Sequence, residues 1–330
     1  MKKIIGLFLI GCSMYVAHAQ KKSNTKNDGL TYAEISIKKG GSWEDGKRGH
    51  KEYVGGVFEN VQELQLDPRH TDHTYFIRYE GPGWENQNVA FRLYLDWRNA
   101  VDIYGKRVKN AVLPEVGQDG FDSYHNDSPW GLDLLKAGKG LGIGGYGRLV
   151  NDTVAKFRQV DDTFVKIKNG KKSSGFEIQY KGWKTGDHKT DLTTNVTIYP
   201  YDRFSKFELQ TQKLTEGLTT GIVKFKDIPL KEKKSQNGEW GYIATYGTQS
   251  LFSKTDLLGM AIFYKTSEIE KTVEAKHDHL IVFKPTTKKV TYYILAAWEQ
   301  ETNGITNEAE FYNDLDNKLI LLEKKHRLNN

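Results

Sequence analysis

Short runs in which apolar and polar residues alternate recur along most of this chain, and they limit its fold more than any other feature. The run from Phe91 to Arg98 has Phe, Leu, Leu and Trp on one side and Arg92, Tyr94, Asp96 and Arg98 on the other. A period of two residues is that of a β-strand, whose side chains point alternately to the two faces of a sheet. Similar runs cover Thr74–Tyr79, Phe176–Lys181, Leu192–Ile198, Phe204–Gln210, Leu258–Tyr264, His279–Phe283 and Val290–Ala297. Many short strands at near-regular spacing predict an all-β fold built as an antiparallel sandwich or barrel.

Two segments break this pattern and predict helices. Ser128 followed by Pro129 has the pattern of an N-cap and a first helical residue, which predicts a short helix ending near Lys136. A second helix is predicted to begin at Asn307 and to pack on the outside of a sheet. Its apolar stripe consists of Phe311, Leu315, Leu319 and Leu322. No linker or change of composition divides residues 31–330, so one domain is predicted.

The N-terminus has the pattern of an export signal. Two lysines precede an apolar stretch, and Ala17-His18-Ala19 forms a small-x-small cleavage site, which predicts a signal peptide over residues 1–19. The apolar stretch is far shorter than the ~20 residues that cross a bilayer as a helix. Residues 20–30 are predicted to form a flexible tether. Export to the periplasm is the main prediction, and a lipoprotein anchored through Cys12 is the alternative.

Composition excludes several classes of function. Cys12 is the only cysteine, so the exported chain has no disulfide, no cysteine nucleophile and no cysteine-ligated zinc. The net charge is +6, but the basic residues are scattered and form no nucleic-acid-binding stripe. A mildly basic surface suits an anionic saccharide, although ordinary solubility explains it equally well.

The stretch from Gly120 to Gly147 is the most unusual part of the sequence. It brings the phenol of Tyr124, the imidazole of His125 and the indole of Trp130 close to the amines of Lys136 and Lys139, among many glycines. Such loops carry sites when a rigid scaffold holds them. The alternative is an ordered crossover that closes one end of the sandwich. A GxGxxG spacing also occurs here, but it follows no strand, so dinucleotide binding is excluded.

The polar face of the run that ends at Arg98 is a second candidate site. Arg92 and Arg98, with Asp96 between them, have the chemistry to hold an anionic substrate. A solvated outer face with ion pairs across strands is the alternative. His70 and His73, like the pair His277 and His279, have metal-like spacing but no clear third ligand. No cofactor is therefore predicted, and a bound divalent metal stays open.

Three stretches of the chain resemble a known family. They are residues 91–106 (FRLYLDWRNAVDIYGK), 128–147 (SPWGLDLLKAGKGLGIGGYG) and 239–264, which contain EWGYIATYGTQS and LLGMAIFY. The family consists of secreted bacterial proteins and is known as domain of unknown function 4861. The resemblance implies a supersandwich like that of galactose mutarotases and polysaccharide lyases. It also implies a role in polysaccharide degradation, as a dehydratase of oligosaccharides from ulvan, a sulfated uronate-rhamnose polymer.

A uronate dehydratase makes definite chemical demands. It removes the proton at C5 of the non-reducing-end uronic acid (GlcA or IdoA) and expels the hydroxyl at C4, which gives a 4,5-unsaturated uronyl residue. The reaction needs a cation at the carboxylate, a base and an acid. The predicted catalytic residues are His125 as base, Arg98 at the carboxylate, and Tyr124 or Tyr246 as acid. The predicted substrate-binding residues are Arg92, Asp96, Trp130, Lys136, Lys139 and Arg148.

Other functions stay open at this point. A polysaccharide lyase uses the same elimination with a sugar as leaving group, and a noncatalytic carbohydrate-binding protein would use the same aromatic and basic residues. An aldose epimerase has only fold analogy in its favour. The predicted partner is an anionic oligosaccharide, and the other enzymes of the pathway are linked to the chain only by function.

Overall fold

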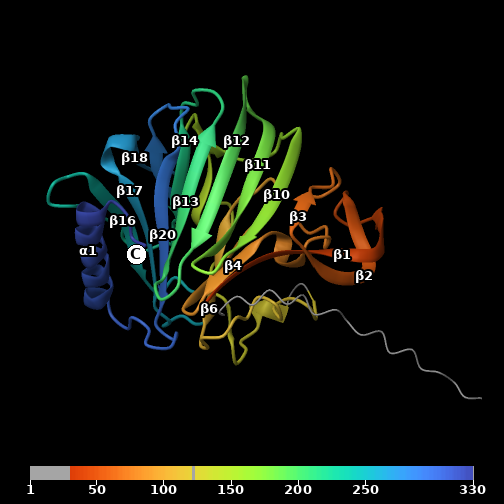
Figure 1. Cartoon of the computed structure of the whole chain (residues 1–330), viewed down its shortest axis with the longest axis horizontal. Coiled ribbons are helices and arrows are strands. Elements are labelled where there is room, and N and C mark those ends of the chain that lie inside the picture. The colour runs from red at the N-terminus through yellow and green to blue at the C-terminus, as the bar shows by residue number, and fades with distance from the viewer. Residues whose placement is uncertain (1–29, 121–122, 330) are drawn as a thin grey trace, which may run out of the picture.

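The chain folds into three antiparallel β-sheets and one long α-helix (Figure 1). The computed structural model describes residues 30–120 and 123–329. The predicted signal peptide (residues 1–19), Cys12 and all but the last residue of the predicted tether (20–30) lie outside the described residues. No helix among the described residues is long and apolar enough to cross a membrane.

The largest sheet has nine strands, in the order β15-β16-β17-β20-β13-β12-β11-β10-β3. Its strands are β3 (Glu63–Gln65), β10 (Asp162–Asn169), β11 (Ser174–Thr185), β12 (His188–Ile198), β13 (Phe204–Thr211), β15 (Lys231–Lys234), β16 (Trp240–Gly247), β17 (Leu258–Lys265) and β20 (Val290–Trp298). The six-stranded sheet, in the order β2-β1-β4-β5-β6-β7, contains β1 (Thr31–Asp45), β2 (Lys51–Val61), β4 (Gly83–Asn86), β5 (Val89–Leu93), β6 (Val101–Lys106) and β7 (Gly131–Asp133).

The five-stranded sheet, in the order β18-β19-β14-β8-β9, contains β8 (Ile143–Val150), β9 (Thr153–Ala155), β14 (Leu218–Val223), β18 (Ile269–Glu274) and β19 (Asp278–Phe283). Single 3-10 turns lie at η1 (Arg78–Glu80), η2 (Ser123–His125) and η3 (Thr266–Glu268), and the α-helix is α1 (Glu308–Lys325).

The main core lies between the large sheet and the two smaller ones. Trp84 of β4 packs edge-on against Phe176 of β11, with ring centroids 5.1 Å apart. At the other smaller sheet, the hydroxyl of Tyr292 on β20 donates a 2.7 Å hydrogen bond to the carbonyl of Gly144 on β8. One cluster of buried side chains includes residues of all three sheets. The protein is therefore nearly all β and sandwich-like, as predicted.

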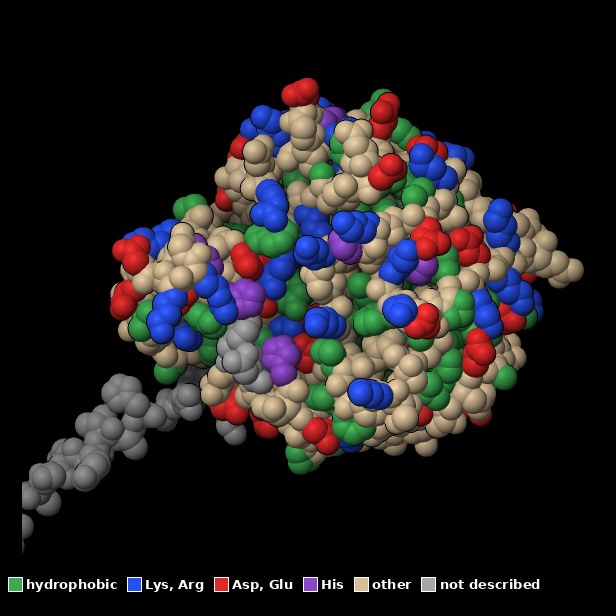
Figure 2. Space-filling model, turned by 180° about the vertical axis from the view of Figure 1, so that it is seen from behind, with side chains coloured by type: hydrophobic (Ala, Val, Ile, Leu, Met, Phe, Trp, Pro, Cys, Tyr) green, Lys and Arg blue, Asp and Glu red, His purple; other side chains and the backbone are tan. Residues whose placement is uncertain are grey.

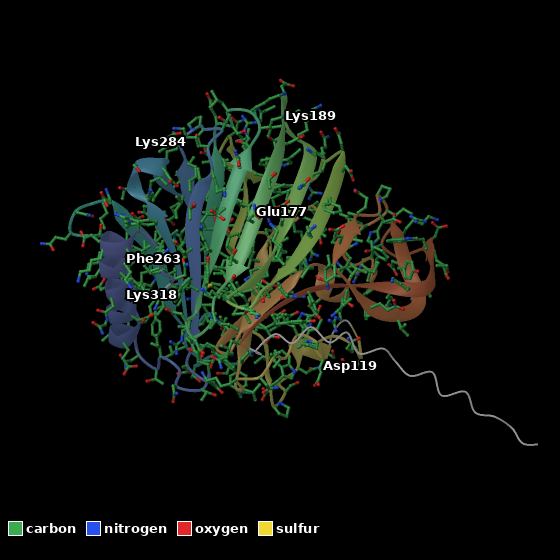
Figure 3. All side chains as sticks on the ribbon, viewed as in Figure 1. Asp119, Glu177, Lys189, Phe263, Lys284 and Lys318 are labelled. Atoms are coloured by element: carbon green, nitrogen blue, oxygen red, sulfur yellow. The ribbon has the colours of Figure 1, made fainter. Side chains whose placement is uncertain are left out.

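Helix α1 covers the opposite face of the large sheet (Figure 1). Phe263 of β17 lies in this second apolar layer, between the strand and the helix (Figure 3). Strands β16, β17 and β20 are thus buried on both faces, which explains why they are apolar at almost every position. The side chain of Asn307 accepts a 2.9 Å hydrogen bond from the backbone N–H of Glu310, so the predicted N-cap is confirmed.

The helix predicted over residues 128–136 is wrong. Residues Ser128 and Gly131 form a tight turn, and Gly131 to Asp133 then pair with β6 as strand β7. A Cβ at Gly131 would collide with the carbonyl oxygen of Gly105, and the φ of Gly131 is +131°, so only glycine fits this close approach. Pairing with the sheet therefore overrides the local helix-start signal.

Two of the predicted strands also differ from the structure. The run at Phe91–Arg98 ends as a strand at Leu93 and continues as a turn. The segment Thr74–Tyr79 is a loop that leads into η1. In and beside that loop His73, Tyr75, Tyr79 and Glu80 all have positive φ. Left-handed backbone at non-glycine residues costs on the order of 1 kcal/mol each and tends to cluster at functional sites.

Candidate active site

Arg92 is the centre of a buried polar cluster at the edge of the six-stranded sheet. Its side chain is 2 % exposed, and its Nη1 donates a 2.9 Å hydrogen bond to the hydroxyl of Tyr124. Its Nη2 lies 2.9 Å from the hydroxyl of Tyr94, 3.0 Å from Asp102 Oδ2 and 2.6 Å from Asp133 Oδ2. Both terminal nitrogens of the guanidinium are engaged by these groups, while Nε has no hydrogen-bond partner among the described residues. Arg92 is buried and organises the cluster from below.

The sheet register brings these partners to Arg92. In the β5–β6 hairpin Arg92 is directly opposite Asp102, and in the β6–β7 pair Tyr104 is opposite Asp133. The ring of Tyr104 lies 5.5 Å from the guanidinium carbon of Arg92. Three adjacent strands thus place one cation and two carboxyl groups on one face of the sheet.

A single guanidinium cannot neutralise both carboxyl groups. Burial, together with the charge of Asp102, raises the pKa of Asp133 to about 8, against the opposing effect of Arg92. Burial also raises the pKa of Asp102, which accepts a hydrogen bond from Tyr94. Burial thus opposes ionisation of both carboxyl groups, and they titrate as an interacting pair.

We predict a pH dependence of stability from this shift. Because the pKa of Asp133 rises from 3.8 to about 8 on folding, the folded chain keeps a proton that the unfolded chain releases between those values. The free energy of unfolding should therefore fall as the pH rises from about 4 to 8. Asp133→Asn, which cannot ionise, should reduce this fall by several kcal/mol, because each unit of pKa shift corresponds to about 1.4 kcal/mol.

Urea unfolding of both proteins at several pH values measures this effect. The comparison with the variant is necessary because burial also raises the pKa of Glu301 to about 7 and of Asp278 to about 6. These groups stay the same in both proteins. Equal pH slopes for the wild type and the variant would contradict the prediction.

His125 lies between this buried cluster and solvent. Its side chain is 40 % exposed, and its Nε2 is 3.5 Å from Asp133 Oδ2. The 3-10 turn η2 bends the chain so that the ring of His125 packs on that of Tyr124, with centroids 4.6 Å apart. Burial raises the pKa of Tyr124, so its hydroxyl stays protonated at neutral pH. An accessible imidazole oriented by a buried carboxyl group has the arrangement of a general base.

Arg98 lies in the turn that follows β5, beside the same cluster. Its guanidinium carbon is 3.9 Å from the centroid of the Tyr94 ring, and its side chain is 14 % exposed. Its Nε and Nη2 donate to Asp96, and its Nη2 also lies 2.6 Å from Glu80 Oε1. Asp96 therefore holds Arg98 in place. Nη1 of Arg98 makes no hydrogen bond within residues 30–120 and 123–329.

His73 is a second, partly exposed imidazole near Arg98, which the sequence indicated only through its metal-like spacing with His70. Its Nδ1 lies 3.4 Å from Asp72 and 3.9 Å from Glu80, and its side chain is 29 % exposed. Its backbone N–H donates a 3.2 Å hydrogen bond to Glu80 Oε1. Seen from behind, histidine and basic side chains gather around a depression in the middle of this face (Figure 2). Among the described residues no group of His, Cys, Asp and Glu could hold a metal ion.

The other predicted site residues lie elsewhere. Tyr246 stacks on Phe311 of α1, with centroids 5.2 Å apart, on the opposite face of the large sheet. Arg148 donates to backbone carbonyls of Glu216 and Thr185 on another part of the surface. The structure therefore groups neither residue with the cluster at Arg92.

Three further predicted residues have different positions. Trp130 is half-buried, edge-on against Tyr104 at 6.0 Å, and closes the floor of the cluster. Lys136 is exposed after β7. Lys139 lines a separate cavity together with Trp97. The structure thus brings together Tyr124, His125, Arg92, Asp96 and Arg98 from the predicted set, and adds His73, Glu80, Asp102 and Asp133.

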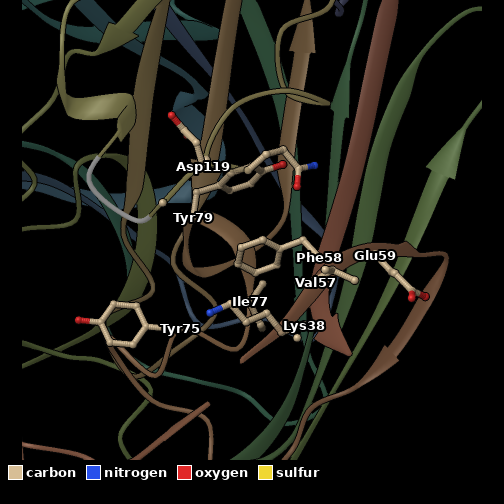
Figure 4. A pocket seen from close by; sticks show the side chains of 12 residues that line it. Lys38, Val57, Phe58, Glu59, Tyr75, Ile77, Tyr79 and Asp119 are labelled. Atoms are coloured by element: carbon tan, nitrogen blue, oxygen red, sulfur yellow. The ribbon is translucent and has the colours of Figure 1, made fainter. Parts of the chain in front are cut away.

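A cavity of about 910 Å3 lies on the far side of Tyr79 (Figure 4). The hairpin β1–β2 and the segment that ends at Gly120 line it. The ring of Tyr79 packs edge-on against Tyr104, 6.1 Å away, and so forms a wall between this cavity and the cluster at Arg92. Tyr79 also hydrogen-bonds to Glu34, the buried partner of Arg78.

Comparison with known proteins gives one family match. The model of a family described as "Domain of unknown function (DUF4861)" matches residues 13–327, which is most of the chain. No curated protein matches the chain.

Proposed function

Since the chain belongs to the family DUF4861, whose function the family's description leaves open, we propose a function from the site itself. We propose that the protein is a dehydratase that removes water from the non-reducing-end uronic acid of an ulvan-type oligosaccharide. The observation that carries this proposal is one buried cluster around Arg92 that holds two accessible groups. The exposed imidazole of His125 lies 3.5 Å from its Asp133, and the guanidinium of Arg98 packs on its Tyr94. The proposed base, His125, and the proposed carboxylate-binding cation, Arg98, thus both pack on the buried polar cluster around Arg92.

His125 takes the proton from C5 of the uronate. The carbon acid is weak, so the base must be accessible to substrate and held in a fixed orientation. Exposure of the ring meets the first demand, and the contact with Asp133 together with stacking on Tyr124 meets the second. The electron pair of the C5–H bond then forms the C4=C5 double bond.

Arg98 binds the carboxylate of the substrate. Negative charge flows into that carboxylate as the proton leaves, and a cation held in place beforehand stabilises it. Asp96, Glu80 and the ring of Tyr94 fix the guanidinium, while its Nη1 is left for the substrate. A planar guanidinium also recognises the planar carboxylate by its shape.

The hydroxyl at C4 leaves as water and takes a proton from the protein. His73, the other exposed imidazole of the site, is the donor that we assign, in contact with Asp72 and Glu80. Tyr124 is 2 % exposed, and its hydroxyl accepts a hydrogen bond from Nη1 of Arg92, so it supports His125 from below. This assignment replaces the earlier prediction of tyrosine as the acid.

Incubation with uronate-terminated oligosaccharides tests the function. The ultraviolet absorbance of an unsaturated uronate should rise, and mass spectrometry should find the loss of one water at unchanged chain length. Shorter unsaturated products would instead identify a polysaccharide lyase. Retention of the oligosaccharide without any change in absorbance would leave a carbohydrate-binding protein.

The proposed reaction also fits an exported protein. A dehydratase in the periplasm would act on fragments that a lyase or hydrolase has already cut, and its unsaturated product would pass to a hydrolase specific for such ends. Both partners are linked to this chain through the oligosaccharide alone.

A further inference from the structure

A second cavity, of about 700 Å3, has a strongly basic lining. Lys139, Lys156, Arg158 and Lys184 line it together with His277, and its lining includes no Asp or Glu. None of the four lysine and arginine side chains makes a salt bridge with residues in the described part of the chain. Lysine and arginine on a protein surface are ordinarily interspersed with acidic residues, so a cavity with cations alone is a candidate anion site.

The buried side chain of Phe157 fixes the backbone that carries two of these cations, Lys156 and Arg158. Phe157 stacks on Trp183, with ring centroids 4.6 Å apart, and its backbone N–H bonds to the carbonyl of Trp97 at 3.0 Å. Its neighbours in sequence, Lys156 and Arg158, both line the cavity. Burial of the phenylalanine therefore fixes the backbone from which the two cations extend.

Aromatic and carbonyl contacts hold these cations without neutralising them. The guanidinium of Arg158 lies 3.6 Å from the centroid of a ring of Trp97, whose indole N–H is fixed by a 2.8 Å hydrogen bond to Asp72. Nζ of Lys156 donates to the carbonyls of Lys139 and Gly140, at 3.1 and 2.5 Å. A cation–π contact orders the guanidinium but leaves its N–H groups for an oxyanion.

The cations of the cavity act on one another. Burial, together with the charges of Arg98 and Arg158, lowers the pKa of Lys156 to about 8, against the opposing charges of Asp278 and Asp96. Burial lowers the pKa of His277, and Lys139 and Lys156 contribute to that shift. Positive charge in the cavity is therefore undercompensated, and a bound anion would relieve the repulsion.

The cavity adjoins the candidate active site. Trp97 lines the cavity and Arg98, the next residue in the same turn, lies in the active site. Asp72 links the two as well, because it contacts Trp97 on one side and His73 on the other. A ligand with charged groups on neighbouring sugars could reach both places.

We propose that this cavity binds an oxyanion group, a sulfate ester or a carboxylate, on a sugar near the uronate that enters the active site. The identity of the ligand in this proposal rests on the proposed function. Binding of the ligand to the cavity can nevertheless be measured without turnover. It would select anionic chains over neutral ones and position the terminal uronate beneath His125.

Calorimetric titration with a sulfated uronate oligosaccharide and its desulfated counterpart tests the subsite. Lys184→Glu reverses one charge of the cavity, and Lys254→Glu makes the same change at an exposed lysine outside it. Lys184→Glu should weaken binding of the sulfated ligand about tenfold, which corresponds to about 1.4 kcal/mol, and Lys254→Glu should leave it within about twofold. Loss confined to the sulfated ligand identifies a sulfate ester, and equal loss for both ligands identifies a carboxylate.

Equal affinities of the two variants, or no binding by the wild type, would overturn the subsite. If the wild type dehydrates the substrate while both variants behave alike, the subsite fails and the proposed function stands. If no substrate is dehydrated but Lys184→Glu alone weakens binding, the proposed function fails and the anion site stands. Arg158→Gln, which keeps a polar side chain, provides a second variant from the same cavity.

Discussion

Replacement of His125 by asparagine should lower the rate of uronate dehydration by about 10²–10⁴-fold, the range in which a general base contributes. Asparagine keeps a polar side chain of similar reach but cannot take a proton at neutral pH. Because the histidine side chain is 40 % exposed, the free energy of unfolding should change by less than about 0.5 kcal/mol. Initial rates, measured from the absorbance of the unsaturated product, give the effect.

A matched control exists in His326, at the C-terminal end of α1. Its φ is +57°, a conformation that asparagine also adopts readily, and it is exposed on the face away from the site. His326→Asn should keep full activity. A similar loss in both variants would point to a general effect on the fold, and full activity of His125→Asn would remove this histidine from the mechanism.

Replacement of Arg92 by methionine should destabilise the fold by about 3–5 kcal/mol, the cost of leaving buried carboxyl groups without their cation. Asp102 and Asp133 both lie within 3.0 Å of its Nη2, and each is 1 % exposed. Methionine fills much of the same volume, so the loss comes from the unpaired carboxyl groups and not from a cavity. Chemical denaturation of the purified variant measures the change.

Two further variants make this result specific. Arg69→Met breaks an ion pair with Asp67 in which the arginine side chain is 50 % exposed, and it should cost at most about 1 kcal/mol. Adding Asp102→Asn to Arg92→Met should recover part of the lost stability, because it removes one of the uncompensated groups. A small loss for Arg92→Met, equal to that of Arg69→Met, would show that the buried cluster contributes little to stability.

The candidate site combines features that sequence reasoning found with features that it missed. Tyr124 and His125 are neighbours in the chain and chemically conspicuous, so they could be selected directly. Asp102 could have been found by pairing the run at Phe91 with the one that follows it, because a hairpin places Arg92 opposite Asp102. Asp133 could not, because the segment that contains it was predicted to be helical.

His73 and Glu80 carried a weaker signal. The spacing of His70 and His73 drew attention as a metal motif, but His70 is turned inward and hydrogen-bonds to Thr74 at 2.8 Å. Burial lowers the pKa of His70, which keeps its ring neutral. The left-handed backbone at His73 and Glu80 results from the buried contacts around Arg98, and no local pattern predicts such a conformation.

Local periodicity was enough to predict several elements of this protein. Strands β11, β12, β13, β17, β19 and β20 lie where alternation or apolar runs predicted them, and α1 begins at its predicted cap. The alternation of apolar and polar residues is a local property, because successive side chains of a strand point to opposite faces of the sheet and one face is more buried than the other. The all-β class and the helix on the outside of a sheet followed from it.

Contacts between residues far apart in the chain determine on which side of its sheet each side chain lies. They also determine which loops lie together at the candidate site. Tyr246 has the same chemistry as Tyr124, but alternation along β16 directs it toward α1 and away from the site. Arg92 and Arg98 have similar sequence surroundings, yet pairing across three strands buries the first while a turn leaves the second partly exposed. Burial and charge pairing depend on residues that are distant in the chain. They explain why Arg92 supports the site from within while Arg98 is accessible to a ligand.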